Sequence, residues 1–115
     1  MTIQRIQTGP RMSQAVIHNK IVYLAGQVAS GASVAIQTRE ILATIDALLA
    51  EAHTDKSRLL TATIWLTDMA TFAEMNSVWQ SWVVPGETPA RATVMSSHLA
   101  SIEFKIEIAV VAAQP

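Results

Sequence analysis

The chain has no cysteine and few charged residues, and both absences narrow what the protein can be. Without cysteine, disulfides, thiol catalysis and thiolate metal sites are excluded. Charged residues make up only 15% of the 115 residues, the net charge is −1, and the eight Lys and Arg residues form no basic stripe. Nucleic-acid binding depends on phosphate neutralisation, so this distribution argues against a nucleic acid as the partner.

The sequence also lacks long apolar runs, repeats, low-complexity tracts and linkers. No segment is long and apolar enough to span a membrane, and residues 1–7 contain no apolar signal-peptide core. We therefore expect a cytoplasmic protein that needs no membrane, folded as a single domain over residues 1–115. Half of the residues are hydrophobic, which is rich for a small monomer and suggests that a partner subunit covers part of the surface.

Hydrophobic periodicity predicts an α+β domain. Apolar residues at helical spacing predict two helices, and alternating or β-branched segments predict six strands. The second helix begins at a capping-box pattern, Thr71 to Glu74, and ends before Pro85 and Gly86. The predicted strands cover 3–6, 13–18, 21–26, 59–67, 91–96 and 104–112, and the predicted helices cover 34–52 and 71–84. This β-β-β-α-β-α-β-β order predicts a two-layer domain in which both helices cover one face of a sheet.

Arg91 and Glu107 lie inside the last two predicted strands, and Lys105 lies near the start of the second of these strands. Buried charges are costly unless they are paired or used. If these strands pair as antiparallel neighbours, Thr93 lies opposite Glu107 and Arg91 lies on the diagonal, so both charges reach one ligand. A guanidinium that binds a carboxylate beside a Glu that handles a proton suits a small anionic substrate. The structural alternative is a salt bridge between the two or with a neighbouring subunit.

Other candidate chemistry is weak. The three histidines, His18, His53 and His98, lack metal-ligand spacing, so we expect no metal site. The serines lack a histidine–carboxylate arrangement that would indicate a nucleophile.

From end to end the chain resembles the RidA/YjgF family. The similarity lies in six segments in the family's order, each weak alone: 9–16 (GPRMSQAV), 22–28 (VYLAGQV), 37–39 (QTR), 63–79 (TIWLTDM, then FxxMNxxW), 89–94 (PARATV) and 106–108 (IEI). The resemblance implies a chorismate-mutase-like fold assembled as a homotrimer, in which three sheets form a central barrel and clefts lie between subunits. It also implies a cofactor-free enzyme that hydrolyses reactive 2-imino acids to 2-keto acids and ammonia.

The resemblance assigns roles to individual residues. Arg91 takes the place of the family's clamp for the substrate carboxylate, and Glu107 takes the place of the acid that positions and activates water. Gly26 and Asn76 match positions that line the cleft, although Asn76 also suits a purely structural hydrogen bond. Thr93 stands where the family often has cysteine.

Two further positions depart from the family pattern. The usual cleft tyrosine is absent, with Met12 at the nearest position and Arg11 beside it, and the usual serine before Gly-Gln is Ala25. Arg11 is either a second carboxylate contact or an exposed loop residue. His18-Asn19 and the tryptophan-rich second helix resemble a divergent branch of the family.

Other functions remain open at this point, including a purely structural partner protein, which would leave the Arg91 and Glu107 pair unexplained. A binding protein on the same fold would hold a small carboxylate metabolite without turnover, and would need Arg91 but not Glu107. A nuclease or translation-inhibiting role, sometimes attributed to the family, is weaker because the chain has no basic patch.

Overall fold

The structure is a computed structural model that describes residues 2–115; Met1, the first residue of the predicted domain, lies outside the described residues. The predicted element order is confirmed, and most bounds agree to within two residues. The elements are β1 (Gln4–Thr8), β2 (Ser13–His18), β3 (Ile21–Leu24), α1 (Val34–Glu51), the short 3₁₀ helix η1 (Lys56–Arg58), β4 (Leu59–Leu66), the 3₁₀ helix η2 (Met69–Thr71), α2 (Phe72–Trp82), β5 (Ala90–Met95) and β6 (Ile106–Ala113).

The six strands form one sheet in the order β1-β2-β3-β6-β4-β5. The β4–α2–β5 unit is a crossover between parallel neighbours, and β6 then runs back antiparallel between β3 and β4. The expectation that the last two strands pair with each other is therefore wrong, because β4 separates β5 from β6. The nearly apolar sequence of β6 fits this central place, since a strand in mid-sheet has neighbours on both sides.

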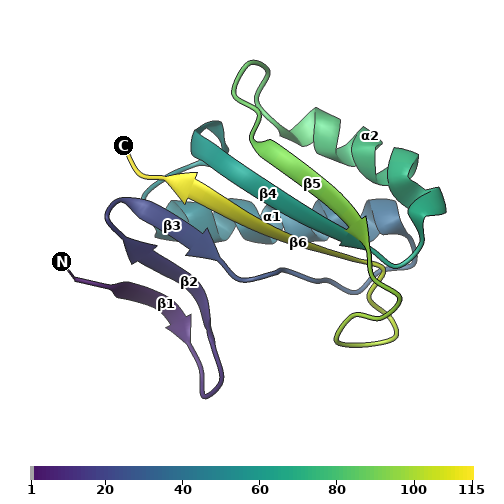
Figure 1. Cartoon of the computed structure of the whole chain (residues 1–115), viewed down its shortest axis with the longest axis horizontal. Helices are drawn as coiled ribbons and strands as arrows, with labels where there is room; N and C mark the ends of the chain where they lie inside the picture. The colour runs from purple at the N-terminus through teal and green to yellow at the C-terminus, as the bar shows by residue number, and fades with distance from the viewer. Residues whose placement is uncertain (1) are drawn as a thin grey trace.

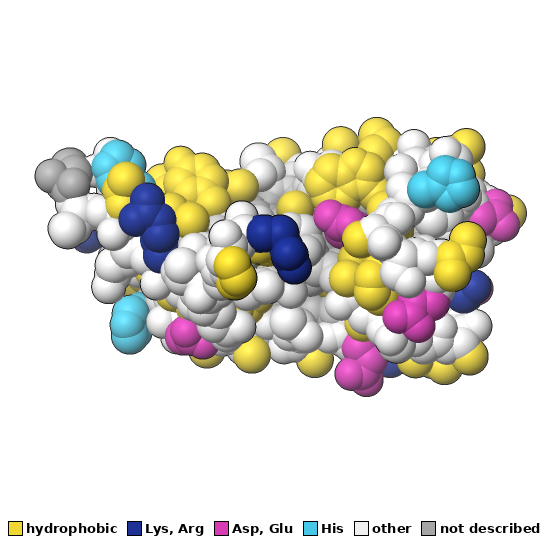
Figure 2. Space-filling view, turned by 90° about the horizontal axis from the view of Figure 1, so that it is seen from below, with side chains coloured by type: hydrophobic (Ala, Val, Ile, Leu, Met, Phe, Trp, Pro, Cys, Tyr) yellow, Lys and Arg dark blue, Asp and Glu magenta, His cyan; other side chains and the backbone are white. Residues whose placement is uncertain are grey.

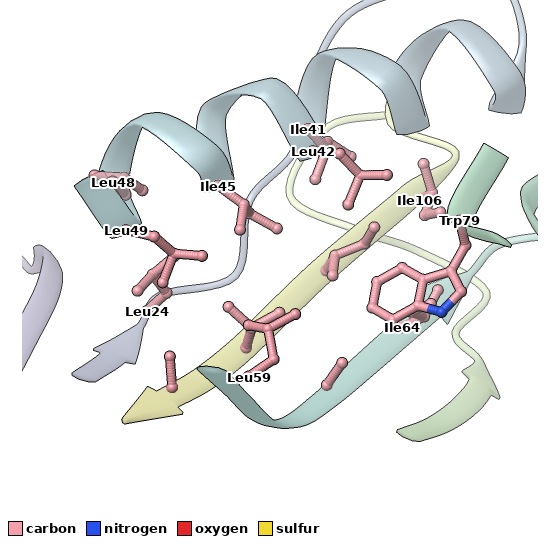
Figure 3. Close-up of a cluster of buried hydrophobic side chains, with 14 of the residues drawn as sticks. Leu24, Ile41, Leu42, Ile45, Leu48, Leu49, Leu59, Ile64, Trp79 and Ile106 are labelled. Atoms are coloured by element: carbon pink, nitrogen blue, oxygen red, sulfur yellow. The ribbon is translucent and has the colours of Figure 1, made fainter. Parts of the chain in front are cut away.

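Both helices pack against one face of the sheet and leave the other face bare, as Figure 1 shows. The domain measures 43 × 38 × 20 Å, and its shortest dimension leaves room for one helix layer and one sheet layer. Figure 3 shows the core between the layers, where leucine and isoleucine side chains of α1 meet Ile64 of β4, Ile106 of β6 and Trp79 of α2. We call the opposite side, which carries no helix, the open face.

Alternate residues of the central strands project onto the open face. Strand neighbours in register point to the same side of a sheet, so the fully buried Ile64 and Ile108 mark the helix side and the residues next to them mark the open face. The open face is made by Tyr23, Thr63, Trp65, Ala92, Val94, Glu107, Ala109 and Val111. It is largely apolar, although Tyr23 and Val94 are 48% and 42% exposed in the single chain.

The two helices are linked at their N-terminal ends, and one predicted cap is wrong. Ser33 caps α1 by accepting a hydrogen bond from the Ile36 amide. Thr71 makes no side-chain cap, so the capping box predicted for α2 does not form. Instead the Glu74 carboxylate accepts a hydrogen bond from the Ala35 amide at 2.8 Å and satisfies the first turn of α1.

The long connection between β5 and β6 is held down by a buried glutamine. The Gln37 amide nitrogen donates to the carbonyls of Gly31 and Glu103, both at 2.9 Å, and its oxygen accepts from the Lys105 amide at 2.9 Å. Gln37 has no exposed surface, so these bonds satisfy a polar group that would be costly to leave unpaired. Among the helices of residues 2–115, none is both long and apolar enough to cross a bilayer.

Candidate functional site

Arg91 lies at the edge of the sheet, on the helix side, beneath α2. Its Nη1 donates a hydrogen bond to Asn76 Oδ1 at 2.7 Å. The guanidinium carbon lies 5.7 Å from the ring centre of Phe72 and 5.6 Å from that of Trp79. Partial burial lowers the pKa of Arg91 from its usual value, yet an arginine remains charged. Among residues 2–115, the hydrogen-bonding partner of Arg91 is the neutral side-chain amide of Asn76. This bond holds the guanidinium without neutralising its charge.

Thr93 follows on the same side of β5. It pairs with Ile64 of β4, whose side chain is fully buried on the helix side. The Thr93 hydroxyl oxygen is buried and has no hydrogen-bond partner among the described residues. A buried hydroxyl without a partner is unusual in a folded protein.

Glu107 lies in β6 and projects from the open face, half-buried against Gly26. A Cβ atom built on Gly26 would clash with the Glu107 carboxylate and lie 2.8 Å from its Cδ and 3.1 Å from its Cγ. The segment carrying Gly26 is fixed to β6, because Gln27 and Ile108 exchange both of their backbone hydrogen bonds. The glycine therefore allows the backbone to approach the carboxylate closely.

Within one chain, Arg91 and Glu107 do not meet, and the predicted shared geometry is wrong. Arg91 is in register with Ala62 of β4, whereas Glu107 is in register with Trp65. Three positions along one strand span about 10 Å, and an odd separation places the two side chains on opposite faces of the sheet. The structural alternative of an ion pair between them inside one chain is excluded by the same register.

Arg11 and Met12 belong to another part of the sheet. They belong to the turn between β1 and β2, which the Gly9 amide closes by donating to the Met12 carbonyl at 2.8 Å. Both side chains are exposed, and β1 and β5 form opposite edges of the sheet. In the single chain Arg11 is an exposed turn residue and contacts neither charge of the predicted pair.

Three hollows of the single chain lie elsewhere. These hollows, with volumes of about 510, 640 and 280 Å³, are lined by the β5–β6 connection, by the β2–β3 turn with the chain end, and by the surface between α1 and α2. Arg91 and Glu107 line none of these three. In residues 2–115, no three His, Asp or Glu side chains are grouped closely enough to hold a metal ion.

The ring of Phe72 beside Arg91 was not predicted from the sequence. Trp79 is a buried member of the core and also lies beside the guanidinium. A signal was present in the spacing, because residues 72, 76 and 79 lie on one face of a helix. Both rings and the amide meet Arg91 from that face.

The fold and these residues define a chorismate-mutase-like α+β domain with an arginine clustered under its second helix. Comparisons with known proteins agree. The family model described as Endoribonuclease L-PSP matches residues 2–114. The RutC family protein YoaB of Escherichia coli K12 is 44% identical over 114 residues, covering 98% of this chain and 99% of its own. A RutC family protein of Haemophilus ducreyi is 43% identical over 113 residues, covering 96% of both chains.

Solved structures give the same result. NMB1025 of Neisseria meningitidis, described as a member of the YjgF protein family, superposes with a TM-score of 0.97 at 45% identity, covering 100% of this chain and 97% of its own. This protein belongs to the RidA/YjgF/RutC family, as the six sequence segments indicated.

Proposed function

We propose that the protein hydrolyses reactive 2-imino acids to 2-keto acids and ammonia, in clefts formed between copies of the chain. The observation that carries this proposal is the environment of the Arg91 guanidinium. The guanidinium is partly desolvated, lies near two aromatic rings and is held by a neutral amide. Such a group is arranged to bind a carboxylate through two parallel hydrogen bonds.

The chemistry needs one further group, and Glu107 is suited to it. The substrate reacts as the protonated imine. A water oxygen attacks its imine carbon while the Glu107 carboxylate takes one proton from that water, which gives a neutral carbinolamine. The carbon–nitrogen bond then breaks as the amino nitrogen receives that proton and the carbinolamine hydroxyl releases its own proton to solvent, which leaves a 2-keto acid and ammonia. General acid–base help of this kind contributes roughly 10²- to 10⁴-fold to a rate.

The two groups can act on one ligand only if they come from different copies. The register places them on opposite faces of one sheet, so a second copy must present its open face, with Glu107, to the edge that carries Arg91. The bare apolar open face supports such an assembly, because a monomer rarely leaves a surface of this kind exposed. A closed ring of three copies, with the open faces turned inward, would form the barrel that the family resemblance implies.

The alternative function is binding of a small carboxylate metabolite without turnover. The Arg91 contacts support this function equally well, since they require no acid. Glu107 discriminates between the two: a binding protein tolerates its replacement, and an enzyme does not. The family model's description names an endoribonuclease, but the Lys and Arg side chains visible in Figure 2 are dispersed among acidic ones and form no stripe that would bind a nucleic acid.

A coupled assay tests the reaction. An amino-acid oxidase generates a panel of 2-imino acids in the presence of semicarbazide, a competing nucleophile, and formation of free 2-keto acid is measured. We expect the wild type to increase this formation, and Arg91→Ala and Glu107→Gln each to lose the increase. Arg39→Ala and Glu40→Gln, matched changes at exposed positions of α1, should behave as the wild type. No increase with small, branched or aromatic imines would favour the binding protein.

Mixing the two inactive variants tests the origin of the site. If Arg91 and Glu107 come from different copies, a trimer containing both variants has one intact site. Random assortment of equal amounts then restores about a quarter of the wild-type sites. If both residues act from one chain, the refolded mixture stays inactive.

A further inference from the structure

Helix α2 presents three side chains to Arg91 from one face. Asn76 accepts the Nη1 hydrogen bond at 2.7 Å, and the rings of Phe72 and Trp79 lie at 5.7 and 5.6 Å from the guanidinium carbon. Residues three and four positions apart are neighbours on a helix surface, so these three form a continuous strip. We call Phe72, Asn76, Trp79 and Arg91 the arginine cluster.

The helix that carries this strip is attached firmly to α1. The Glu74 carboxylate accepts a hydrogen bond from the Ala35 amide at 2.8 Å near the start of α2. At its other end, Trp82 Nε1 donates to the Asp46 carboxylate of α1 at 3.0 Å. A side chain on such a helix starts from a fixed backbone position. A side chain that orients a binding group needs a fixed position of this kind.

The chemical nature of the Asn76 contact is the decisive feature. A guanidinium has five N–H donors in one plane, and a single bond to Asn76 leaves four of them for a ligand. An amide oxygen fixes the plane without neutralising the charge. A carboxylate at the same place would fix the plane equally well but would supply the counter-charge that a ligand carboxylate should bring.

We propose that Asn76 is a positioning residue, which orients the Arg91 guanidinium through Nη1 and keeps its charge available because the amide is neutral. This inference rests on the proposed function for the identity of the ligand, a 2-imino or 2-keto acid. It differs from the expectation that Asn76 contacts the substrate itself. It also explains why an asparagine, and not an acid, faces an arginine at 2.7 Å.

The first experiment observes Arg91 without any ligand. In a protein with ¹⁵N-labelled arginine, restrained rotation about the Cζ–Nη1 bond gives separate, slowly exchanging Nη signals, and Arg91→Lys identifies them by their disappearance. We expect Asn76→Ala to average these signals and Asn76→Asp to retain them. Unchanged Arg91 signals in Asn76→Ala would overturn the inference, whatever the enzyme does.

The second experiment measures the charge effect with stable probes, the 2-keto acids pyruvate, 2-oxobutanoate and phenylpyruvate. We expect Asn76→Asp to raise their Kd about 10- to 100-fold, the size of a lost charge-assisted contact, and to raise KM for imines far more than it lowers kcat. Asn19→Asp makes the same chemical change in the β2–β3 turn, where φ is 54°, and should leave Kd within about twofold of wild type because it touches no Arg91 contact.

The two proposals fail in distinguishable ways. Tight binding by Asn76→Asp, equal to that of the wild type, would overturn the role of Asn76 and leave the deaminase proposal intact. A wild type that neither binds 2-keto acids nor hydrolyses imines would overturn the deaminase proposal, and the Arg91 signals of Asn76→Ala would still decide whether Asn76 positions the guanidinium.

Discussion

Gly26 and Glu107 are in close contact on the open face, and this contact predicts an unusual variant. In Gly26→Ala the new methyl group would overlap the carboxylate and lie 2.8 Å from Cδ, so the Glu107 side chain must rotate away. Because the obstructing atoms belong to a flexible side chain, we expect stability to fall by less than about 1 kcal/mol. The rate of imine hydrolysis by Gly26→Ala should nevertheless fall to the rate of Glu107→Gln.

The control for this variant is Gly9→Ala. There the new Cβ meets only the Met12 carbonyl oxygen, at 3.5 Å, which is an ordinary contact. Thermal unfolding should therefore be similar in both variants, and only Gly26→Ala should lose the reaction. A Gly26→Ala protein with full activity would show that the placement of Glu107 beside Gly26 is not required.

Thr54 and Thr93 offer a matched test of the unpartnered hydroxyl. The Thr54 hydroxyl donates to the Ala113 carbonyl at 2.6 Å, whereas the Thr93 hydroxyl has no partner in residues 2–115. Valine has nearly the same shape as threonine, so Thr54→Val should cost about 0.5–1.5 kcal/mol, and Thr93→Val should cost nothing or stabilise the protein. Urea denaturation of both variants checks this. A cost at Thr93 as large as that at Thr54 would show that a partner, such as another copy, satisfies its hydroxyl.

At the scale of elements, Glu74 joins α2 to the first turn of α1. Removing its carboxylate leaves the Ala35 amide without a partner, so we expect Glu74→Ala to destabilise the protein by about 0.5–2 kcal/mol, the usual cost of a lost helix cap. Hydrogen exchange should speed up at the Ala35 amide first. Glu40→Ala, at an exposed position of α1, should change the stability much less. Equal effects of the two variants would argue against the link.

Local patterns predicted the elements well, and they failed where distant segments choose their neighbours. Periodicity indicated α1 and β6 to within a residue or two, because the pattern of core-facing side chains is set by the residues of the segment itself. The same periodicity does not say which strands become neighbours. The β4–α2–β5 crossover makes parallel neighbours of β4 and β5 and leaves β6 to enter beside β3, so the assumed pairing of the last two strands failed.

The candidate site shows the same division. Arg91, Asn76 and Thr93 were expected near one another, and α2 and β5 do bring Arg91 and Asn76 together. Glu74 was assigned to the cap of its own helix, since the capping-box spacing is met in the sequence, but the amide of another helix is its partner. The separation of Arg91 from Glu107 could not be read from alternation alone, because their faces depend on the register of β4 with both strands.

For the whole molecule, the prediction concerns the open face. Hydrophobic side chains gather along one edge of the view in Figure 2, and the domain is only 20 Å thick, so a large apolar surface has no cover in the single chain. We expect copies of the chain to cover it in solution. Val94 lies on this face in register with Trp65, and a lysine there would bury an unpaired charge in the assembly.

Val94→Lys should therefore shift the protein from trimer to monomer in gel filtration with light scattering, and should abolish imine hydrolysis even though Arg91 and Glu107 are intact. Ile36→Lys is the matched control, because Ile36 is 43% exposed and Val94 42%, but Ile36 lies on α1, on the helix side. The control should remain a trimer with full activity, since a charge on an exposed helix surface stays in water. A Val94→Lys monomer that still hydrolyses imines would mean that one chain contains the whole site. If the wild type is itself a monomer, Glu107 cannot reach Arg91, because the register of β4 places the two side chains on opposite faces of the sheet. The two residues would then have separate roles.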